Sequence, residues 1–322
     1  MNNSLNTTPD QRKHKIVNLI RKMSITVLIL FTMFAHAIIL GFNSAPTYAY
    51  SPCNCVIFAM DDIADYGSNK VQLETMDYFI SKNLPFTASI VVSQFANSSN
   101  LDVFRKVEEG LDKNLFELAI HGYRHVHHSQ LTKEEQKDDF SRANAKLEYL
   151  FGKRADIFIP PFNDFNLHTI EAMADLNIAL FSTHPDAEQK TTNPYKSQTL
   201  VVTNNSKLGV SKISDEKPLV YHAPFLASFL RLRTEGVFGE ESVEESMRLI
   251  DESIAMYGFA HVRLHPSDFS QVNTTSGKAI NKVDNVRFQH LTTLVDNLED
   301  RNIKIASFRD VYSPSPNLVF DN

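Results

Sequence analysis

The sequence predicts a parallel α/β fold, specifically a (β/α) barrel that is closed or nearly closed. Short apolar runs of strand length alternate with longer amphipathic segments of helix length through most of the chain. The number of strand–helix units, roughly seven or eight, is that of a barrel. Polar residues gather where the strands end, which is where such folds carry their chemistry. Alternation by itself would equally allow an open, doubly wound sheet.

The first half of the chain contains four of these units. Each expected strand is a short apolar run, and the third, Leu115-Phe-Glu-Leu-Ala-Ile120, reads as a buried strand. The fourth helix begins at Thr132, and Glu135 three positions later completes a capping box. Pro160-Pro161 ends the fourth strand. We expect strands at 56–60, 86–92, 115–120 and 156–159, and helices at 69–82, 100–113, 132–151 and 167–176.

The second half continues the alternation after an irregular stretch. Residues 185–220 are less periodic and richer in Asn, Ser, Thr and Lys, which predicts a loop excursion with one or two strands. A loop is expected at 270–282. The remaining strands are expected at 178–182, 259–264 and 303–307, and the remaining helices at 242–257 and 284–300.

Residues 1–49 have the features of an export leader, and residues 50–322 are expected to form one catalytic domain. Five basic residues precede an apolar run at 25–42, and Thr47-Tyr-Ala49 is an acceptable cleavage site. The run has 18 residues, near the lower limit for spanning a bilayer, so a cleaved signal peptide and a retained membrane anchor are both open. We therefore expect an extracellular or cell-surface protein that contacts the membrane only through this segment.

The net charge argues against one class of function, and the two cysteines allow few roles. The formal charge is −6; without residues 1–49 it is 27 basic minus 37 acidic groups, or −10. An acidic domain of this kind is a poor candidate for binding nucleic acid. The only cysteines are Cys53 and Cys55. A bridge between such close neighbours is expected to be strained, so a structural or intermolecular role is favoured.

Two strand ends carry side chains suited to metal chemistry. Asp61-Asp62 follows the strand at 56–60, and His121 and His125 follow the strand at 115–120. Two imidazoles and one carboxylate can hold a divalent metal, with the second carboxylate left beside it, and this set favours hydrolysis by an activated water. Each motif is weak alone, because helices also place residues four apart on one face and Asp pairs are common in turns.

Several other polar residues are weaker candidates. His127 and His128 are expected on the surface, where a His-rich tract could bind metal adventitiously. The structural interpretation is also favoured for His184, Asp186 and His222.

The set of motifs resembles the polysaccharide deacetylase family, the NodB-homology carbohydrate esterases. The resemblance covers roughly residues 55–310 and rests on four segments in order: Phe58 to Asp62, His121 to His125, Ile159 to Phe162, and Arg263 to His265. It implies a distorted seven- or eight-stranded (β/α) barrel. Gly122 stands where the family has Ser or Thr, Ile159 stands where it has Arg, and there is no Trp for the family's acetyl pocket. The chain therefore looks like a divergent member.

The resemblance also implies roles for single residues. Asp62, His121 and His125 would hold Zn²⁺ or another divalent metal such as Co²⁺ or Ni²⁺. Asp61 would act as the catalytic base and His265 as the acid that protonates the leaving amine. The backbone N–H of Phe162 would meet the oxyanion. Further substrate contacts are expected from Pro161, Asn163 and Arg263.

The environment of His265 allows further expectations. Arg263 precedes it by two residues and shares its face of the strand, so Arg263 could tune His265 or pair with Asp61, or equally salt-bridge an outer acid. Asp268 is another expected partner of His265.

The implied activity is metal-dependent removal of N-acetyl groups from a cell-surface or extracellular polysaccharide. One alternative is a catalytically weakened carbohydrate-binding or cell-surface protein on the same fold, for which the loss of the family Arg at Ile159 argues. Retention of both Asp61 and His265 argues against it. Another alternative is a metal-dependent esterase or amidase acting on other substrates, because fold resemblance does not name the substrate.

Overall fold

A computed structural model of the chain describes most of the residues after the leader. The described residues are 47–50, 53–65, 67–97, 100–184, 210–211, 220–225, 227–228, 230–234, 237–240 and 242–315. The leader predicted for residues 1–49 lies outside them except for its last three residues, and so does most of the irregular stretch 185–220. Within the described part, no helix combines the length and apolar character needed to cross a membrane.

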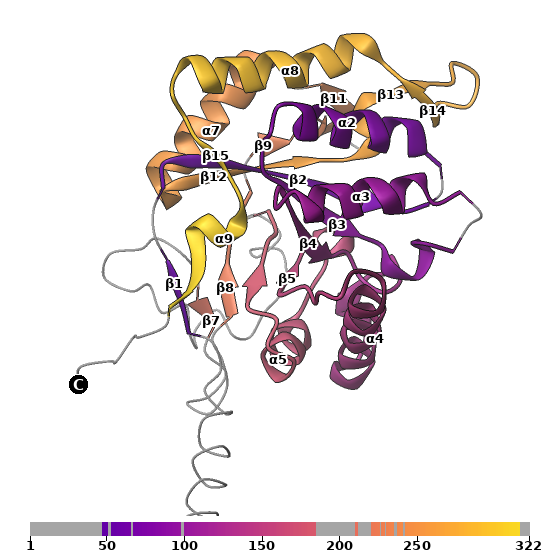
Figure 1. Cartoon of the computed structure of the whole chain (residues 1–322), viewed down its shortest axis with the longest axis vertical. Helices are drawn as coiled ribbons and strands as arrows, with labels where there is room; N and C mark the ends of the chain where they lie inside the picture. Colours follow the sequence, from indigo (N-terminus) through magenta and orange to yellow (C-terminus); the bar gives the residue numbers. More distant parts are fainter. Residues whose placement is uncertain are drawn as a thin grey trace, which may run out of the picture. The chain divides into compact units, whose positions relative to one another are not determined.

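A curled, mostly parallel sheet forms the centre of the molecule (Figure 1). Its strands follow the order β7-β8-β6-β5-β4-β3-β2-β12-β9, and every neighbouring pair is parallel except β7 with β8. Eight parallel strands thus make a curled half-barrel, as the alternating pattern predicts. The strands of this order are β2 (Cys55–Ile63), β3 (Phe86–Ile90), β4 (Phe116–Ile120), β5 (Ile157–Phe158), β6 (Leu180–Phe181), β7 (Val210–Ser211), β8 (Val220–His222), β9 (Ala227–Ser228) and β12 (Phe259–Leu264).

Strand β2, the first strand of the main sheet, pairs with three other strands. Strand β12 pairs with β2 over residues 55–60 of β2, and β3 pairs with its later residues from Ala59 onward. A short late strand, β15 (Ile305–Ala306), pairs with Val56 and Ile57 in the early part of β2. One strand is therefore paired with the strand that follows it, β3, and with two strands from the C-terminal part of the domain, β12 and β15.

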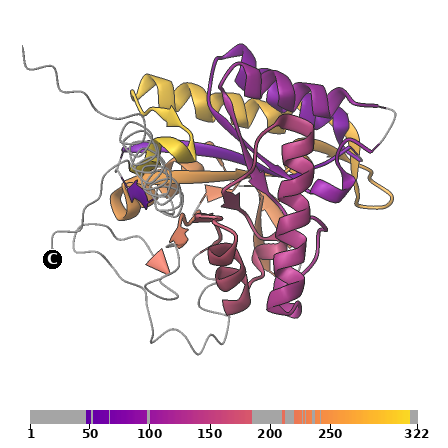
Figure 2. The same ribbon diagram turned by 60° about the horizontal axis from the view of Figure 1, so that its bottom comes forward.

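Helices follow the strands and surround the curled sheet (Figure 2). The large apolar cluster packed between sheet and helices includes Phe58, Phe79, Phe86 and Phe158, all fully buried. Burial of such side chains contributes roughly 1.5–3 kcal/mol each. The helices are α2 (Asn69–Ser81), α3 (Asp102–Asp112), α4 (Lys133–Phe151), α5 (Leu167–Asp175), α7 (Val243–Tyr257), α8 (Asn285–Asp300) and α9 (Phe308–Val311).

A second apolar cluster lines the inner face of the sheet. Successive strand residues point to opposite faces, so Ile57 and Ala59 belong to this inner cluster while Phe58 and Met60 belong to the outer one. Ala119 and Ile159 contribute to the inner cluster from β4 and from the end of β5. Because these strands run parallel, the residues at their carboxyl ends lie at one mouth of the half-barrel.

Local sequence signals account for several element boundaries. Thr132 and Glu135 form the predicted capping box at the start of α4, and the helix ends at Gly152 in the left-handed conformation. The prediction of a loop at 270–282 is wrong. This segment forms an antiparallel hairpin of β13 (Ser270–Val272) and β14 (Ala279–Val283). The hairpin is mostly exposed, so it lacks the alternation of apolar and polar residues that a half-buried strand shows.

The remaining described strands pair outside the main sheet. Strand β1 (Thr47–Tyr50) pairs with β16 (Tyr312–Ser315), and β10 (Leu230–Thr234) pairs with β11 (Val237–Glu240), both antiparallel.

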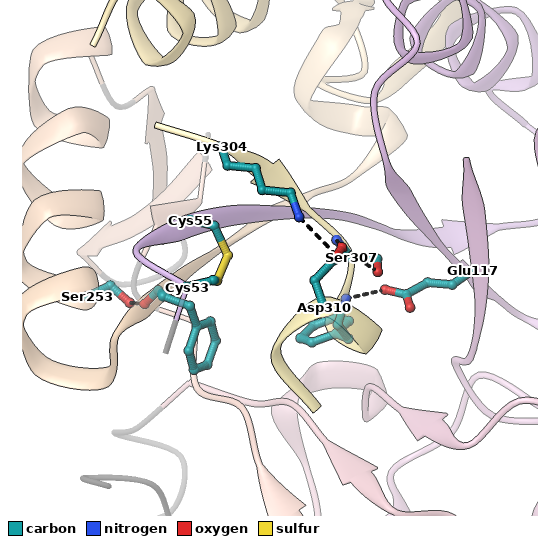
Figure 3. Close-up of a disulfide and its surroundings, with 9 residues drawn as sticks. Cys53, Cys55, Glu117, Ser253, Lys304, Ser307 and Asp310 are labelled. Atoms are coloured by element: carbon teal, nitrogen blue, oxygen red, sulfur yellow. Dashed lines mark hydrogen bonds and ion pairs between the residues drawn. A yellow bond between two sulfur atoms is a disulfide. The ribbon is translucent and has the colours of Figure 1, made fainter. Parts of the chain in front are cut away.

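Cys53 and Cys55 form a disulfide with each other at the start of β2 (Figure 3). The argument against a mutual bridge is therefore wrong, and so is the intermolecular alternative; the pair has the structural role that was the other expectation. The two Cα atoms lie 5.1 Å apart, within the range that a disulfide spans. Backbone N–H groups of Cys53 and Asn54 both donate to the carbonyl of Gly258, which fixes this turn beside β12.

A buried acid joins the sheet to the C-terminal segment. Glu117 on β4 accepts a hydrogen bond of 2.7 Å from the backbone N–H of Phe308 at the start of α9 (Figure 3). It accepts a second, also of 2.7 Å, from the Thr87 hydroxyl. Burial raises the pKa of Glu117 to about 7, and both hydrogen bonds act in the opposite direction.

Candidate metal centre

The end of β2 presents two adjacent carboxylates to the same mouth of the half-barrel. In a regular strand Asp61 and Asp62 would point to opposite faces. The pairing of β2 with β3 shifts register between Met60 and Ile63, and Asp62 has φ +60°, so one extra residue bulges here. Bulges redirect side chains beside functional sites, and Asp residues tolerate the left-handed conformation better than most. Asp61 stays buried, whereas the Asp62 side chain is partly exposed.

The two predicted histidines lie around Asp62. The Nε2 atoms of His121 and His125 are 3.3 and 3.0 Å from the same oxygen, Oδ1 of Asp62. The three side chains offer ligand atoms that all lie within 4.8 Å of one another. His121 is buried and follows β4 directly, while His125 stands on the loop after it and is partly exposed.

A backbone carbonyl sets the tautomer of His121. Its Nδ1 lies 2.7 Å from the carbonyl oxygen of Ile159 and donates to it, which leaves Nε2 as the ring atom that faces Asp62. Metal-ligating histidines are usually held by such an outer hydrogen bond. Ile159 therefore contributes its backbone to the site, although its side chain is apolar and buried.

The electrostatics of this group favour charge separation. Burial raises the pKa of Asp62, but hydrogen bonds with His121 and His125 outweigh it and hold the pKa well below its usual range. Burial lowers the pKa of His121, yet the carboxylates of Asp61 and Asp62 raise it overall. Asp62 is therefore ionised, and the neighbouring carboxylates stabilise the protonated form of His121. The donor set fits a divalent metal.

An acid on α4 supports the histidine loop. Asp139 is buried and accepts hydrogen bonds from the backbone N–H of Tyr123 (2.6 Å) and of Arg124 (3.3 Å). Gly122 has φ +79°, and a Cβ there would lie 2.4 Å from the carbonyl oxygen of Arg124. The loop therefore requires glycine at the position where the resemblance expects Ser or Thr, and Asp139 tethers it instead. No sequence signal separates Asp139 from the other acids of α4.

The two histidines after this loop differ from each other. His128 was expected on the surface, and this is wrong: it is fully buried, stacked on Phe140 with its Nε2 3.5 Å from Asp139. His127 is exposed as expected. Its ring nevertheless stacks on Phe162 at 4.2 Å, so it lies beside the metal-ligating group rather than away from it.

The second carboxylate lies opposite His265. Oδ2 of Asp61 is 3.9 Å from Nε2 of His265, and Oδ1 of Asp61 accepts no hydrogen bond from any described residue. Asp268 accepts the backbone N–H of His265 at 2.7 Å, and its Oδ2 is 3.8 Å from Nδ1 of the same residue. The expected partner Asp268 thus fixes the backbone of His265 and lies near Nδ1 of its ring, while Asp61 lies near Nε2.

The turn after β5 carries the predicted substrate contacts. Pro161 is buried, Phe162 is 54% exposed, and both Phe162 and Asn163 adopt the left-handed conformation with φ near +59° and +54°. Such a conformation is uncommon for a bulky residue and is a mark of functional turns. The Phe162 ring stands edge-on to His125 with centroids 4.5 Å apart, which places this turn against the histidines.

Arg263 reaches this turn from β12. Its Nη1 donates to Oδ1 of Asn163 at 3.1 Å, and its guanidinium lies over the ring of Phe225 at 4.2 Å. Burial lowers the pKa of Arg263, and three nearby carboxylates act in the opposite direction. These belong, in order of effect, to Asp61, Asp268 and Asp62. The cation therefore faces the acids of the site.

The weaker candidates lie apart from the ligand group. His222 is buried, with its ring edge-on to Phe181. His184 is partly buried and packs edge-on against Phe225, which is also the ring beneath Arg263. Asp186 lies outside the described residues. The sequence did not single out Asp139 or Phe225, whose roles depend on contacts between distant segments.

Known families and structures provide a comparison for this arrangement. Residues 51–181 match the model of the polysaccharide deacetylase family. No curated protein sequence matches the chain. A solved putative polysaccharide deacetylase from Mycobacterium smegmatis has 16% identity and a TM-score of 0.54, over 83% of this chain and 92% of its own.

Two further solved structures are more distant. A peptidoglycan N-acetylglucosamine deacetylase has 10% identity and a TM-score of 0.50, over 84% of this chain and 94% of its own. A CE4-family pseudoenzyme from Bacillus anthracis has 11% identity and a TM-score of 0.47, over 82% of this chain and 67% of its own. At such identities the likeness to the first two structures shows a shared fold.

Proposed function

We propose that this chain, whose residues 51–181 belong to the polysaccharide deacetylase family as a divergent member, removes N-acetyl groups from an extracellular or cell-surface polysaccharide. The observation that carries the proposal is one cluster at the strand ends. There the group Asp62, His121 and His125 lies beside the facing pair Asp61 and His265. A protein that only binds sugar would not need both of these sets.

We propose that Asp62, His121 and His125 hold a divalent metal ion. This ion is zinc, or another ion that prefers similar ligands, such as cobalt or nickel. Two imidazole nitrogens and one carboxylate leave an open coordination position, which is the arrangement of catalytic rather than structural sites. When bound, the ion would lower the pKa of a water toward about 7 and polarise the amide carbonyl.

Asp61 then acts as the general base. Its Oδ1 is buried and lacks a hydrogen-bond donor among the described residues, so it is available to accept a proton from the attacking water. The water oxygen adds to the carbonyl carbon of the acetamide. The charge that develops on the carbonyl oxygen would be met by the backbone N–H of Phe162, which belongs to the turn whose aromatic ring lies against His125.

His265 completes the reaction as the general acid. Breakage of the C–N bond leaves an amine that needs a proton, and Nε2 of His265 would donate it, while Asp268 holds the backbone of His265 and lies on the Nδ1 side of its ring. The products are the free amino sugar and acetate. Asn163 and Arg263 hold the turn that carries Phe162.

A sugar-binding protein without activity is the second candidate. The observation that favours it is the apolar side chain of Ile159, buried in the inner cluster, where the resemblance expects an arginine. A metal-dependent esterase or amidase of another substrate would share the same residues, so only a panel of substrates separates it from the deacetylase.

We also propose that the protein is exported, with residues 1–49 as a signal peptide or a membrane anchor at 25–42. The basic residues before the apolar run support this orientation. An acetylated surface glycan would then be within reach of the domain.

The test is metal content followed by acetate release. We expect the purified full-length chain to bind about one zinc ion, and His125→Ala to lose it, because the variant removes one of three protein ligands. The zinc-loaded chain is then offered N-acetylated glycans and acetate is measured. Absence of metal uptake on titration would make the sugar-binding alternative the leading one, and release of acetate only from esters would favour the esterase.

A further inference from the structure

An exposed pair of aromatic rings stands beside the metal-ligating residues. The rings of Phe162 and His127 lie nearly parallel, at 18° and with centroids 4.2 Å apart. Phe162 is 54% exposed, and the His127 side chain is 47% exposed. We call these two rings the aromatic platform. The mechanism proposed above uses only the backbone of Phe162 and makes no use of His127.

The platform is built by contacts from several segments. Nδ1 of His127 is 3.3 Å from Oδ2 of Asp164, and the hydroxyl and backbone N–H of Ser129 donate to the same oxygen at 2.7 and 3.1 Å. Asp164 therefore ties the loop of His127 to the turn that carries Phe162. Asn163 is bonded to Arg263 from the other side. An exposed aromatic residue held in a left-handed turn by this many contacts is a costly arrangement unless its ring has a use.

The position of the platform indicates what it meets. The Phe162 ring is edge-on to His125 at 4.5 Å, so the platform lies directly beside the residues at which the acetamide would react. Aromatic faces of this kind accept flat, weakly polar surfaces, and pyranose rings present such a surface through their axial C–H groups. The surrounding carboxylates of Asp62 and Asp164 disfavour an anionic sugar.

We propose that the aromatic platform of Phe162 and His127 is a subsite for a neutral hexose ring of the substrate, adjacent to the sugar that is deacetylated. The proposal rests on the proposed function, since it assigns a further contact of the same glycan. It makes the preferred substrate an oligomer or polymer rather than a single sugar, because a monomer placed at the metal group leaves the platform without a partner.

The test is a binding measurement that does not depend on turnover. The full-length chain carrying Asp61→Asn is loaded with zinc and titrated calorimetrically with the tetramer of β-1,4-linked N-acetylglucosamine. Adding His127→Ala should raise the dissociation constant about tenfold, in keeping with the worth of one aromatic contact. His127→Phe keeps a ring at this position and should stay within about threefold of the parent. His168→Ala, an exposed histidine on α5, is the matched control and should change nothing.

Three results would overturn the platform. These are no binding of the tetramer, an unchanged constant in His127→Ala, or equal weakening in His127→Ala and His127→Phe with unaltered melting temperatures. The outcome is separable from that of the proposed function. If binding depends on the His127 ring but no glycan releases acetate, the subsite proposal holds and the proposed deacetylase function is wrong. If acetate is released but binding does not depend on the His127 ring, the deacetylase function holds and the subsite proposal is wrong.

Discussion

The guanidinium of Arg263 donates a hydrogen bond of 3.1 Å to Oδ1 of Asn163, and this bond joins β12 to the turn after β5. Arg263 pairs with Ala59 in the register of β12 on β2, so Asp61 lies diagonally ahead of it on the same face. The resemblance left open whether Arg263 serves the site or an outer acid. Its bond and its facing carboxylates place it inside the site.

Replacing Arg263 should therefore reduce turnover without removing metal. Arg263→Met loses both the cation and the bond to Asn163, and we expect kcat/KM to fall about 100-fold, or ~3 kcal/mol. Arg263→Lys keeps the charge but not the planar fork and should be intermediate. Asn163→Ala combined with Arg263→Met should cost less than the sum of the two single variants, because both remove the same bond. Additive losses would show that Arg263 does not act through Asn163.

Replacing Asp61 should separate metal binding from catalysis. Asp61→Asn preserves the size of the side chain and leaves Asp62, His121 and His125 in place, so zinc content should stay at the level of the parent. The amide cannot accept a proton as a base, and general-base contributions are typically 10²–10⁴-fold, so we expect kcat to fall by at least about 100-fold. Acetate release together with zinc content checks this. A near-normal rate would remove Asp61 from the role of base.

The tether from Asp139 should govern the affinity for metal. Asp139→Ala leaves the backbone N–H groups of Tyr123 and Arg124 without their acceptor, which costs roughly 1–3 kcal/mol and loosens the loop between the two histidines. We expect zinc to bind about 10–100-fold more weakly in a competition titration with a chelator. Asp138→Asn, at an exposed neighbour on α4, is the control. Equal zinc affinity in the parent and in Asp139→Ala would contradict the tether.

Glu117 should make the fold less stable as the pH rises. Burial raises its pKa from 4.5 to about 7, so the folded chain holds this proton more tightly than the unfolded chain. The contribution, about 3 kcal/mol at 1.36 kcal/mol per pKa unit, is fully present below pH ~4.5 and is lost as the pH rises to about 7.

The check is chemical denaturation of wild type and Glu117→Gln between pH 4.5 and 8. The amide oxygen can still accept from Thr87 and Phe308, so Glu117→Gln should lack this part of the pH dependence. Glu108→Gln, an exposed change on α3, should retain it. Parallel curves for wild type and Glu117→Gln would show that Glu117 titrates normally.

The parts of the structure that the sequence predicts are those set by local pattern. The apolar runs give the strands of the curled sheet, and Thr132 with Glu135 gives the start of α4. The sequence also predicts that Asp61, Asp62, His121, His125 and His265 meet, because carboxyl ends of parallel strands share one edge.

What the sequence does not predict depends on contacts between distant segments. His128 is buried because Phe140 of α4 packs against its ring, and Asp139 serves the loop because α4 lies behind it. The bulge at Asp62 follows from the register of β2 on β3, which no run of residues encodes by itself. The exposed hairpin at 270–283 lacks the alternation on which strand prediction relies.

The pairing of β15 with β2 has a consequence for when the site can form. The strand that carries Asp61 and Asp62 is the first of the main sheet, and its early residues Val56 and Ile57 lie between Ala260 and His261 of β12 and Ile305 and Ala306 of β15. Contacts of such long sequence separation form late in folding. During synthesis the carboxylate strand therefore lacks one of its partners until the chain has passed residue 306, and we expect stable metal uptake only after that point.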